Sequence, residues 1–226
     1  RDWSSDVCSS DLGANHEDLA EKRIEVLVGQ EGDVAFDPYN GIGANQGTSV
    51  LGEMLASKNG FGLTGISYAA KGKFVPEVTE LLGLLSWNRA NAILLAVNDG
   101  KPGDVILLEM QTTVCGNPIP GPDQNSFGFG PAEEDDDVYD ATVVAIANGI
   151  TVVAAAGNGQ VNLDAPECGD KWNRTKRDSG AIIVGAGGSG LMCMPWSSEA
   201  RAKLLFSTYG SRVDVQGWGE CIYTTD

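Results

Sequence analysis

Hydrophobic positions along the chain follow two patterns, short runs that are apolar throughout and runs with helical spacing. The continuous runs at 104–111, 151–156 and 179–186 are typical of parallel strands that are buried on both faces. Apolar residues three and four apart predict a helix that starts near Gly47, and similar spacing predicts helices over 87–98 and 138–148. Strand and helix alternate, which predicts an α/β fold with three layers, a parallel sheet and helices on both of its faces.

The stretch 151–159 (TVVAAAGNG) is the most informative of these runs. Its alanines and Gly157 leave room for a close neighbour beside the strand. Asn158 then places a side-chain amide at the carboxyl end, where open α/β sheets bind ligands. A neutral donor there suits an oxyanion that forms only in a transition state. Taken alone, the stretch fits a strand that ends in an ordinary Asn-Gly turn better than it fits a ligand site.

Composition excludes several classes of function. The chain has 226 residues, enough for one large domain with a sizeable core. Its formal net charge of −16 argues against nucleic acid and anionic membranes as partners. No apolar run is long enough to span a bilayer.

The first twelve residues require separate treatment. Residues 2–12 (DWSSDVCSSDL) have no strand or helix period and resemble the translation of a common DNA sequencing adapter. We therefore expect 1–12 to be an artefact outside the fold. The domain is then 13–226, and we expect the true N-terminus to be lost.

Two other motifs suggest competing chemistry. Residues 185–190 (GAGGSG) match the dinucleotide pattern G-x-G-x-x-G, but Pro195 interrupts the helix that this pattern needs. The acidic run 133–137 suggests a metal site or, as we favour, the start of a helix whose dipole the carboxylates oppose. His16 is the only histidine in the chain and reads as a surface turn residue.

Several blocks together resemble the subtilisin-like serine proteases (peptidase family S8). The blocks occur in the family's order and cover nearly everything from Gly13 onward. They are 15–19 (NHEDL), 46–53 (QGTSVLGE), 59–66 (NGFGLTGI), 154–158 (AAAGN), 179–186 (SGAIIVGA) and 206–210 (FSTYG). The resemblance implies a subtilisin-like domain, incomplete at both ends, from a secreted, monomeric endopeptidase that cuts extended peptides with an Asp/His/Ser triad.

The resemblance assigns roles to a few residues. Asn158 is the oxyanion donor. One wall of the pocket for the substrate side chain is formed by Ala155, Ala156 and Gly157. The opposite wall is Glu109, Met110 and Gln111, with backbone that pairs with the substrate strand; the family usually has small residues near Glu109 and Gln111.

The departures from the family concern the triad itself. Gln46 stands where the family has histidine, and glutamine cannot take up and release a proton near neutral pH. The family aspartate falls in the adapter-like region, and the family serine falls beyond Asp226. We therefore predict that this chain does not hydrolyse peptides. Gln46 is explained by a sequencing error, by a pseudoprotease that binds peptides without cutting them, or by misalignment of the block.

Four cysteines remain after 1–12 are set aside: Cys115, Cys168, Cys193 and Cys221. Their spacing is not that of a zinc site, and we predict no metal ligands from the sequence. Two disulfides or free thiols are both compatible with the count. Cys115 and Cys168 both follow strands that flank the proposed pocket, so we predict that they pair. Family members often bind calcium; the resemblance alone suggests that cofactor.

Overall fold

The structure is a computed structural model that describes residues 4–9, 16–27, 33–34, 46–81, 84–116, 128–193 and 198–225. The chain divides into two compact units. Unit 1 comprises Arg1–Glu109, Val143–Val152 and Tyr223–Asp226, and unit 2 comprises Met110–Thr142 and Val153–Ile222.

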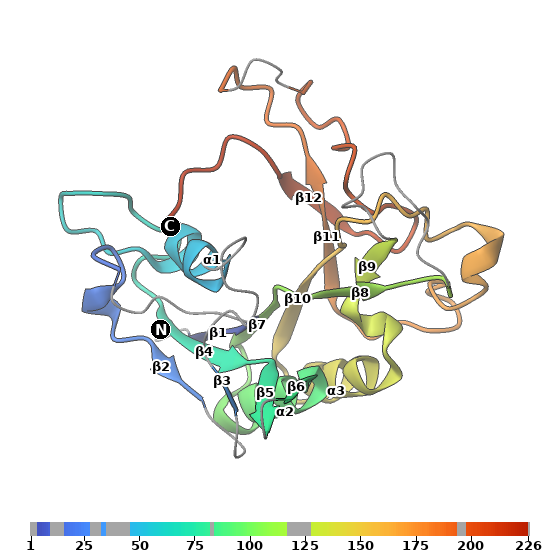
Figure 1. Ribbon diagram of the computed structural model, residues 1–226, viewed down its shortest axis with the longest axis horizontal. Helices are drawn as coiled ribbons and strands as arrows, with labels where there is room; N and C mark the ends of the chain where they lie inside the picture. Colours follow the sequence, from blue (N-terminus) through green and yellow to red (C-terminus); the bar gives the residue numbers. More distant parts are fainter. Residues whose placement is uncertain are drawn as a thin grey trace. The chain divides into compact units, whose positions relative to one another are not determined.

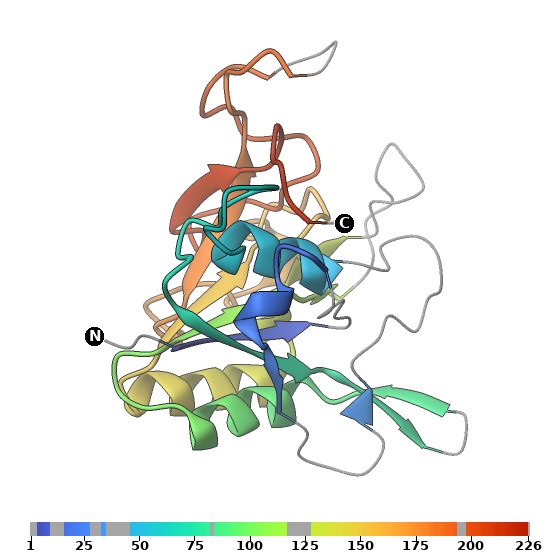
Figure 2. The same ribbon diagram turned by 90° about the vertical axis from the view of Figure 1, so that its left-hand side faces the viewer.

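Unit 1 is built on parallel strands in the order β7-β1-β4-β2 (Figure 1). Helices α1 and α2 cover opposite faces of β1 and β4, which Figure 2 shows from the side, so the predicted three layers are present. A second, antiparallel sheet has the order β3-β5-β6. The bounds are β1 Ser4–Ser9, β2 Glu25–Val26, β3 Asp33–Val34, β4 Lys71–Pro76, β5 Val78–Leu81, β6 Leu84–Trp87, β7 Val105–Leu108, α1 Gln46–Leu55 and α2 Arg89–Asp99.

The predicted helix near Gly47 is α1, and its apolar stripe explains its position. Leu51 and Leu55 are fully buried and pack with Leu19 and Phe74 in one core cluster. Gly72 lies in β4 where the Leu55 side chain crosses it: an added Cβ would come within 2.0 Å of Leu55 Cδ1. A small residue at this position therefore lets α1 pack directly on the sheet.

The expectation that residues 1–12 lie outside the fold is not met at Ser4–Ser9. This stretch forms β1, hydrogen-bonded between β4 and β7. Backbone pairing between two parallel strands needs no side-chain period, so a patternless segment can still occupy a place in a sheet. The resemblance of 2–12 to a sequencing adapter concerns the DNA and stays a prediction.

Unit 2 contains parallel strands in the order β12-β11-β10, of which β10 begins in unit 1. An antiparallel ribbon of β8 and β9 accompanies them. The bounds are β8 Gln111–Thr113, β9 Phe129–Pro131, β10 Thr151–Ala155, β11 Ile182–Gly187 and β12 Val215–Trp218.

The remaining helical elements are distributed over both units. Helix α3 is Asp136–Ala147, and short 3₁₀ turns are Ala20–Lys22, Ala132–Glu134 and Pro166–Cys168. Among the described residues, none of the helices is long and apolar enough to cross a membrane.

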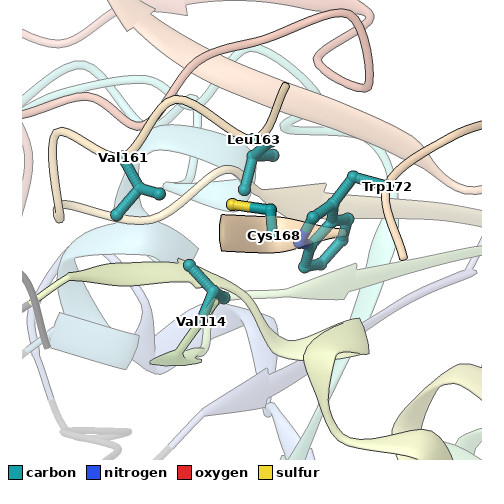
Figure 3. Packing of buried hydrophobic residues seen from close by; sticks show 5 residues of the cluster. All are labelled: Val114, Val161, Leu163, Cys168 and Trp172. Carbon is teal, nitrogen blue, oxygen red and sulfur yellow. The ribbon is translucent and has the colours of Figure 1, made fainter. Parts of the chain in front are cut away.

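A small core beside the β8–β9 ribbon is closed by a disulfide. Val114, Val161, Leu163, Cys168 and Trp172 pack together, as Figure 3 shows. Cys168 is bonded to Cys115, so the predicted pairing is confirmed. A second disulfide joins Cys193 to Cys221.

Candidate functional site

The loop after β10 lies very close to the backbone of β9. Gly157 has φ +90°, a conformation that glycine adopts at little cost. A Cβ on Gly157 would lie 2.7 Å from Gly130 Cα, and one on Gly159 would lie 2.0 Å from Phe129 N. The Gly-Asn-Gly sequence thus allows a backbone-to-backbone contact that larger side chains would prevent.

Asn158 sits between these two glycines and is exposed. Its backbone N–H donates to Gln111 Oε1 at 2.8 Å. The neighbouring Gly157 carbonyl accepts a hydrogen bond from the N–H of Thr208, a residue that is only 1% exposed. The peptide between Gly157 and Asn158 is therefore held by hydrogen bonds at both its carbonyl and its N–H.

The wall residues predicted from the sequence behave differently from one another. Met110 and Ala156 are buried, at 5% and 1% exposure, and Ala155 is half-buried. Gln111 was expected to contribute backbone, but its side chain reaches Asn158. The signal for this role was a polar residue where the family usually has a small one. Glu109 belongs to unit 1 and is described there.

In unit 1, Gln46 and Glu109 form one polar pair. Gln46 is the first residue of α1, and its Nε2 donates to Glu109 Oε1 at 3.2 Å. Glu109 directly follows β7. Burial raises the pKa of the Glu109 carboxyl above its ordinary value; the hydrogen bond from Gln46 opposes this rise in pKa, and the Glu53 carboxylate adds to it. An amide thus binds a carboxyl group at the position that the resemblance assigns to the family's base.

The last described residues of the chain run along the start of α1. Thr225 Oγ1 donates to the Thr48 carbonyl at 2.6 Å, and Ser49 Oγ donates to the Thr225 carbonyl at 2.8 Å. Thr224 Oγ1 also donates to the Ser49 carbonyl. An added Cβ at Gly52 would lie 2.3 Å from Thr225 Oγ1, so the glycine permits this contact.

The carboxylate of Glu220 lies against the glycine-rich motif 185–190. The N–H groups of Ser189 and Ser198 both donate to Glu220 Oε1, at 3.1 and 3.2 Å. No helix begins within the described residues 188–193. A carboxylate thus occupies one backbone donor of the motif, and the helix N-terminus that the dinucleotide interpretation requires is not found in these described residues.

The acidic run 133–137 serves the fold. Glu133 is 2% exposed and accepts hydrogen bonds from Ser179 Oγ and from Arg212. Asp136 and Asp137 lie in the first turn of α3, as expected from the helix dipole. Within the described part of the chain, no group of three His, Cys, Asp or Glu residues could hold a metal ion.

One buried carboxylate bears on the calcium that the resemblance suggests. Asp18 is 3% exposed, and its Oδ1 has no hydrogen-bond partner, while its Oδ2 accepts from the Leu63 N–H at 3.4 Å. The Asp18 N–H donates to His16 Nδ1 at 3.2 Å, a local turn contact. Calcium takes six to eight oxygen ligands. Asp18 could supply one of them; the described residues show no complete set.

The sequence matches no family model and no curated protein. Solved structures match it by fold. The psychrophilic subtilisin-like protease Apa1 from the Antarctic psychrotroph Pseudoalteromonas sp. AS-11 has a TM-score of 0.61 and 21% identity, over 96% of this chain and 41% of that one. This chain has a subtilisin-like fold.

Two further subtilisin-like neighbours agree with that result. The epidermin leader peptide processing serine protease from Staphylococcus aureus has a TM-score of 0.60 and 20% identity, over 96% of this chain and 52% of that one. The nisin leader peptidase NisP from Lactococcus lactis has a TM-score of 0.58 and 18% identity, over 94% of this chain and 61% of that one. The chain therefore spans 41% to 61% of the length of these three proteins.

Proposed function

We propose that this chain is the larger part of a subtilisin-like serine endopeptidase domain, with Asn158 as oxyanion donor. The observation that carries the proposal is the loop after β10, where Gly157 at φ +90° packs on Gly130 and leaves Asn158 exposed on a fixed backbone. A donor fixed before the reaction can stabilise the negative charge of a tetrahedral intermediate without reorganising.

The substrate of this domain is an extended peptide. Two of the structural neighbours are leader-peptide processing proteases, which act on peptide segments. In our proposal Ala155, Ala156 and Gly157 line one side of the substrate side chain, and Glu109, Met110 and Gln111 provide the other. Two disulfides support an oxidising, secretory location.

The chain as written does not hydrolyse peptides. The amide of Gln46 neither accepts a proton from a nucleophile nor returns one to the leaving amine. It donates to Glu109 instead.

A second candidate function is a non-catalytic module that binds peptides. It is favoured by the Gln46–Glu109 hydrogen bond, because a residue with a defined partner is not simply a lost base. In this case the oxyanion loop is retained as part of the binding groove.

The test is to resequence the gene across codon 46 and past both ends, and to express the intact reading frame with Gln46 and as Gln46→His. We expect fluorescent casein to be cut only by the Gln46→His form, and Asn158→Ala to lower its kcat by about 10²–10³-fold. Cutting by the Gln46 form that Asn158→Ala abolishes would refute the predicted inactivity. No cutting by either form, with retained peptide binding, would favour the binding module.

A further inference from the structure

The backbone of the loop after β10 is fixed mainly by other backbone groups. The Ala156 N–H donates to the Val184 carbonyl at 2.9 Å, and the Gln160 N–H donates to the Phe206 carbonyl at 3.0 Å. Such bonds persist whatever side chains are present. The Asn158 N–H differs, because its partner is the side-chain oxygen of Gln111.

Gln111 is well placed to hold a constant position. It begins β8 and pairs with Pro131 of β9, in the same ribbon whose Gly130 touches Gly157. The preceding Met110 is 5% exposed and anchors the strand. Since a backbone N–H can only donate, the Gln111 amide must turn its oxygen toward Asn158 and its Nε2 away.

We propose that Gln111 is a positioning residue, which holds the Asn158 backbone so that the Asn158 side-chain amide keeps one direction. The proposal rests on the proposed role of Asn158 as oxyanion donor. The Gly157–Asn158 peptide has two hydrogen bonds, from the Thr208 N–H to the Gly157 carbonyl at 3.0 Å and from the Asn158 N–H to Gln111, and loss of the Gln111 bond leaves the exposed Asn158 with only the first of them. A donor that must first be oriented stabilises a developing charge less well than a fixed one.

The arrangement also links two parts of the proposed site. Gln111 lies on β8, the strand to which the resemblance assigns the substrate backbone, and its side chain ends on Asn158. Contact of a peptide with β8 and orientation of the oxyanion donor therefore depend on the same residue.

Hydrogen exchange of single amides, followed by NMR on the ¹⁵N-labelled chain, tests the proposal directly. In Gln111→Leu we expect the Asn158 amide to exchange about five- to tenfold faster, the effect of one lost hydrogen bond, while the Ala156 amide is unchanged. Gln111→Glu keeps an acceptor oxygen and should keep the protection. Gln216→Leu, the same change on exposed β12, is the matched control and should affect neither amide.

An unchanged exchange rate of the Asn158 amide in Gln111→Leu would overturn the proposal. Equal acceleration of exchange at Asn158 and Ala156 would also overturn it, because it indicates that the whole region has loosened. These results do not depend on turnover, so they separate this inference from the proposed function. In an intact, active Gln46→His frame, Gln111→Leu should lower kcat about fivefold, and should not lower the kcat of Asn158→Ala any further. Additive effects of the two changes would also contradict a role through Asn158.

Discussion

The two units differ in how they hold their polar groups. Unit 2 contains both disulfides, a buried arginine network and the close glycine contacts of the Asn158 loop. In unit 1 the carboxyl groups of Glu53, Glu77 and Glu109 all have a raised pKa, because burial disfavours their charged form.

This contrast bears on function. The part that we propose to stabilise charge is cross-linked and prearranged, whereas the part that we propose to correspond to the proton-transfer site holds Gln46 and the carboxyl group of Glu109. Oxyanion stabilisation depends on a rigid backbone and survives changes elsewhere; proton transfer depends on one side chain and ends when that side chain is replaced.

The largest expected effect is on the buried network of unit 2. Arg212 is 1% exposed and contacts Glu133 and Asp214. Arg212→Met should lower the free energy of unfolding by about 3–5 kcal/mol, because it leaves the buried Glu133 carboxylate without its cationic partner. Urea denaturation measures this. Lys176→Met, which breaks an exposed pair with Asp170, should cost at most about 1 kcal/mol. Equal losses would show that the buried network stabilises unit 2 no more than an exposed ion pair does.

Removal of the disulfide beside the β8–β9 ribbon should come next. Cys115 and Cys168 are 53 positions apart, so their bond restricts a long loop in the unfolded chain. The double variant Cys115→Ala, Cys168→Ala should be about 2–4 kcal/mol less stable. Thermal melting with and without reductant checks this. If reductant lowers the melting temperature of the double variant as much as that of the parent, the effect belongs to the Cys193–Cys221 bond.

The glycine contact can be isolated with a matched pair. Gly157→Ala combines an unfavourable φ with a collision against Gly130, and should cost about 2–3 kcal/mol. Gly116 has φ +77° but nothing within 4 Å of an added Cβ, so Gly116→Ala should cost about 1 kcal/mol. Equal unfolding midpoints in urea would mean that the backbone contact contributes no stability.

The smallest expected effect is a pH dependence in unit 1. The folded state binds the Glu109 proton more tightly than the unfolded state does, since the folded pKa is raised. Stability should therefore fall as pH rises from the ordinary carboxyl pKa through the raised value. Glu109→Gln should remove this loss and be more stable by about 1 kcal/mol at neutral pH. Melting temperatures of both forms between pH 4 and pH 8 measure it; parallel curves would contradict the assignment.

Much of the fold could be predicted from local pattern. The helix near Gly47, the strands that became β10 and β11, and the Cys115–Cys168 pairing were all confirmed. Each of these predictions depends on residues that are close along the chain or on the order of the strands. The spacing of apolar residues indicates both. The strand Ser4–Ser9 was missed because backbone pairing leaves no period in its side chains.

By itself the sequence determined the alternation of strands and helices, the position of Asn158 after a buried strand, and the glutamine at position 46. Only the tertiary structure decided the partners of these residues. Gln46 meets Glu109, 63 positions away, and Asn158 meets Gln111, 47 positions away. Hydrogen bonds of this kind depend on where distant backbones are brought together, and a single side chain in the sequence carries no record of its partner.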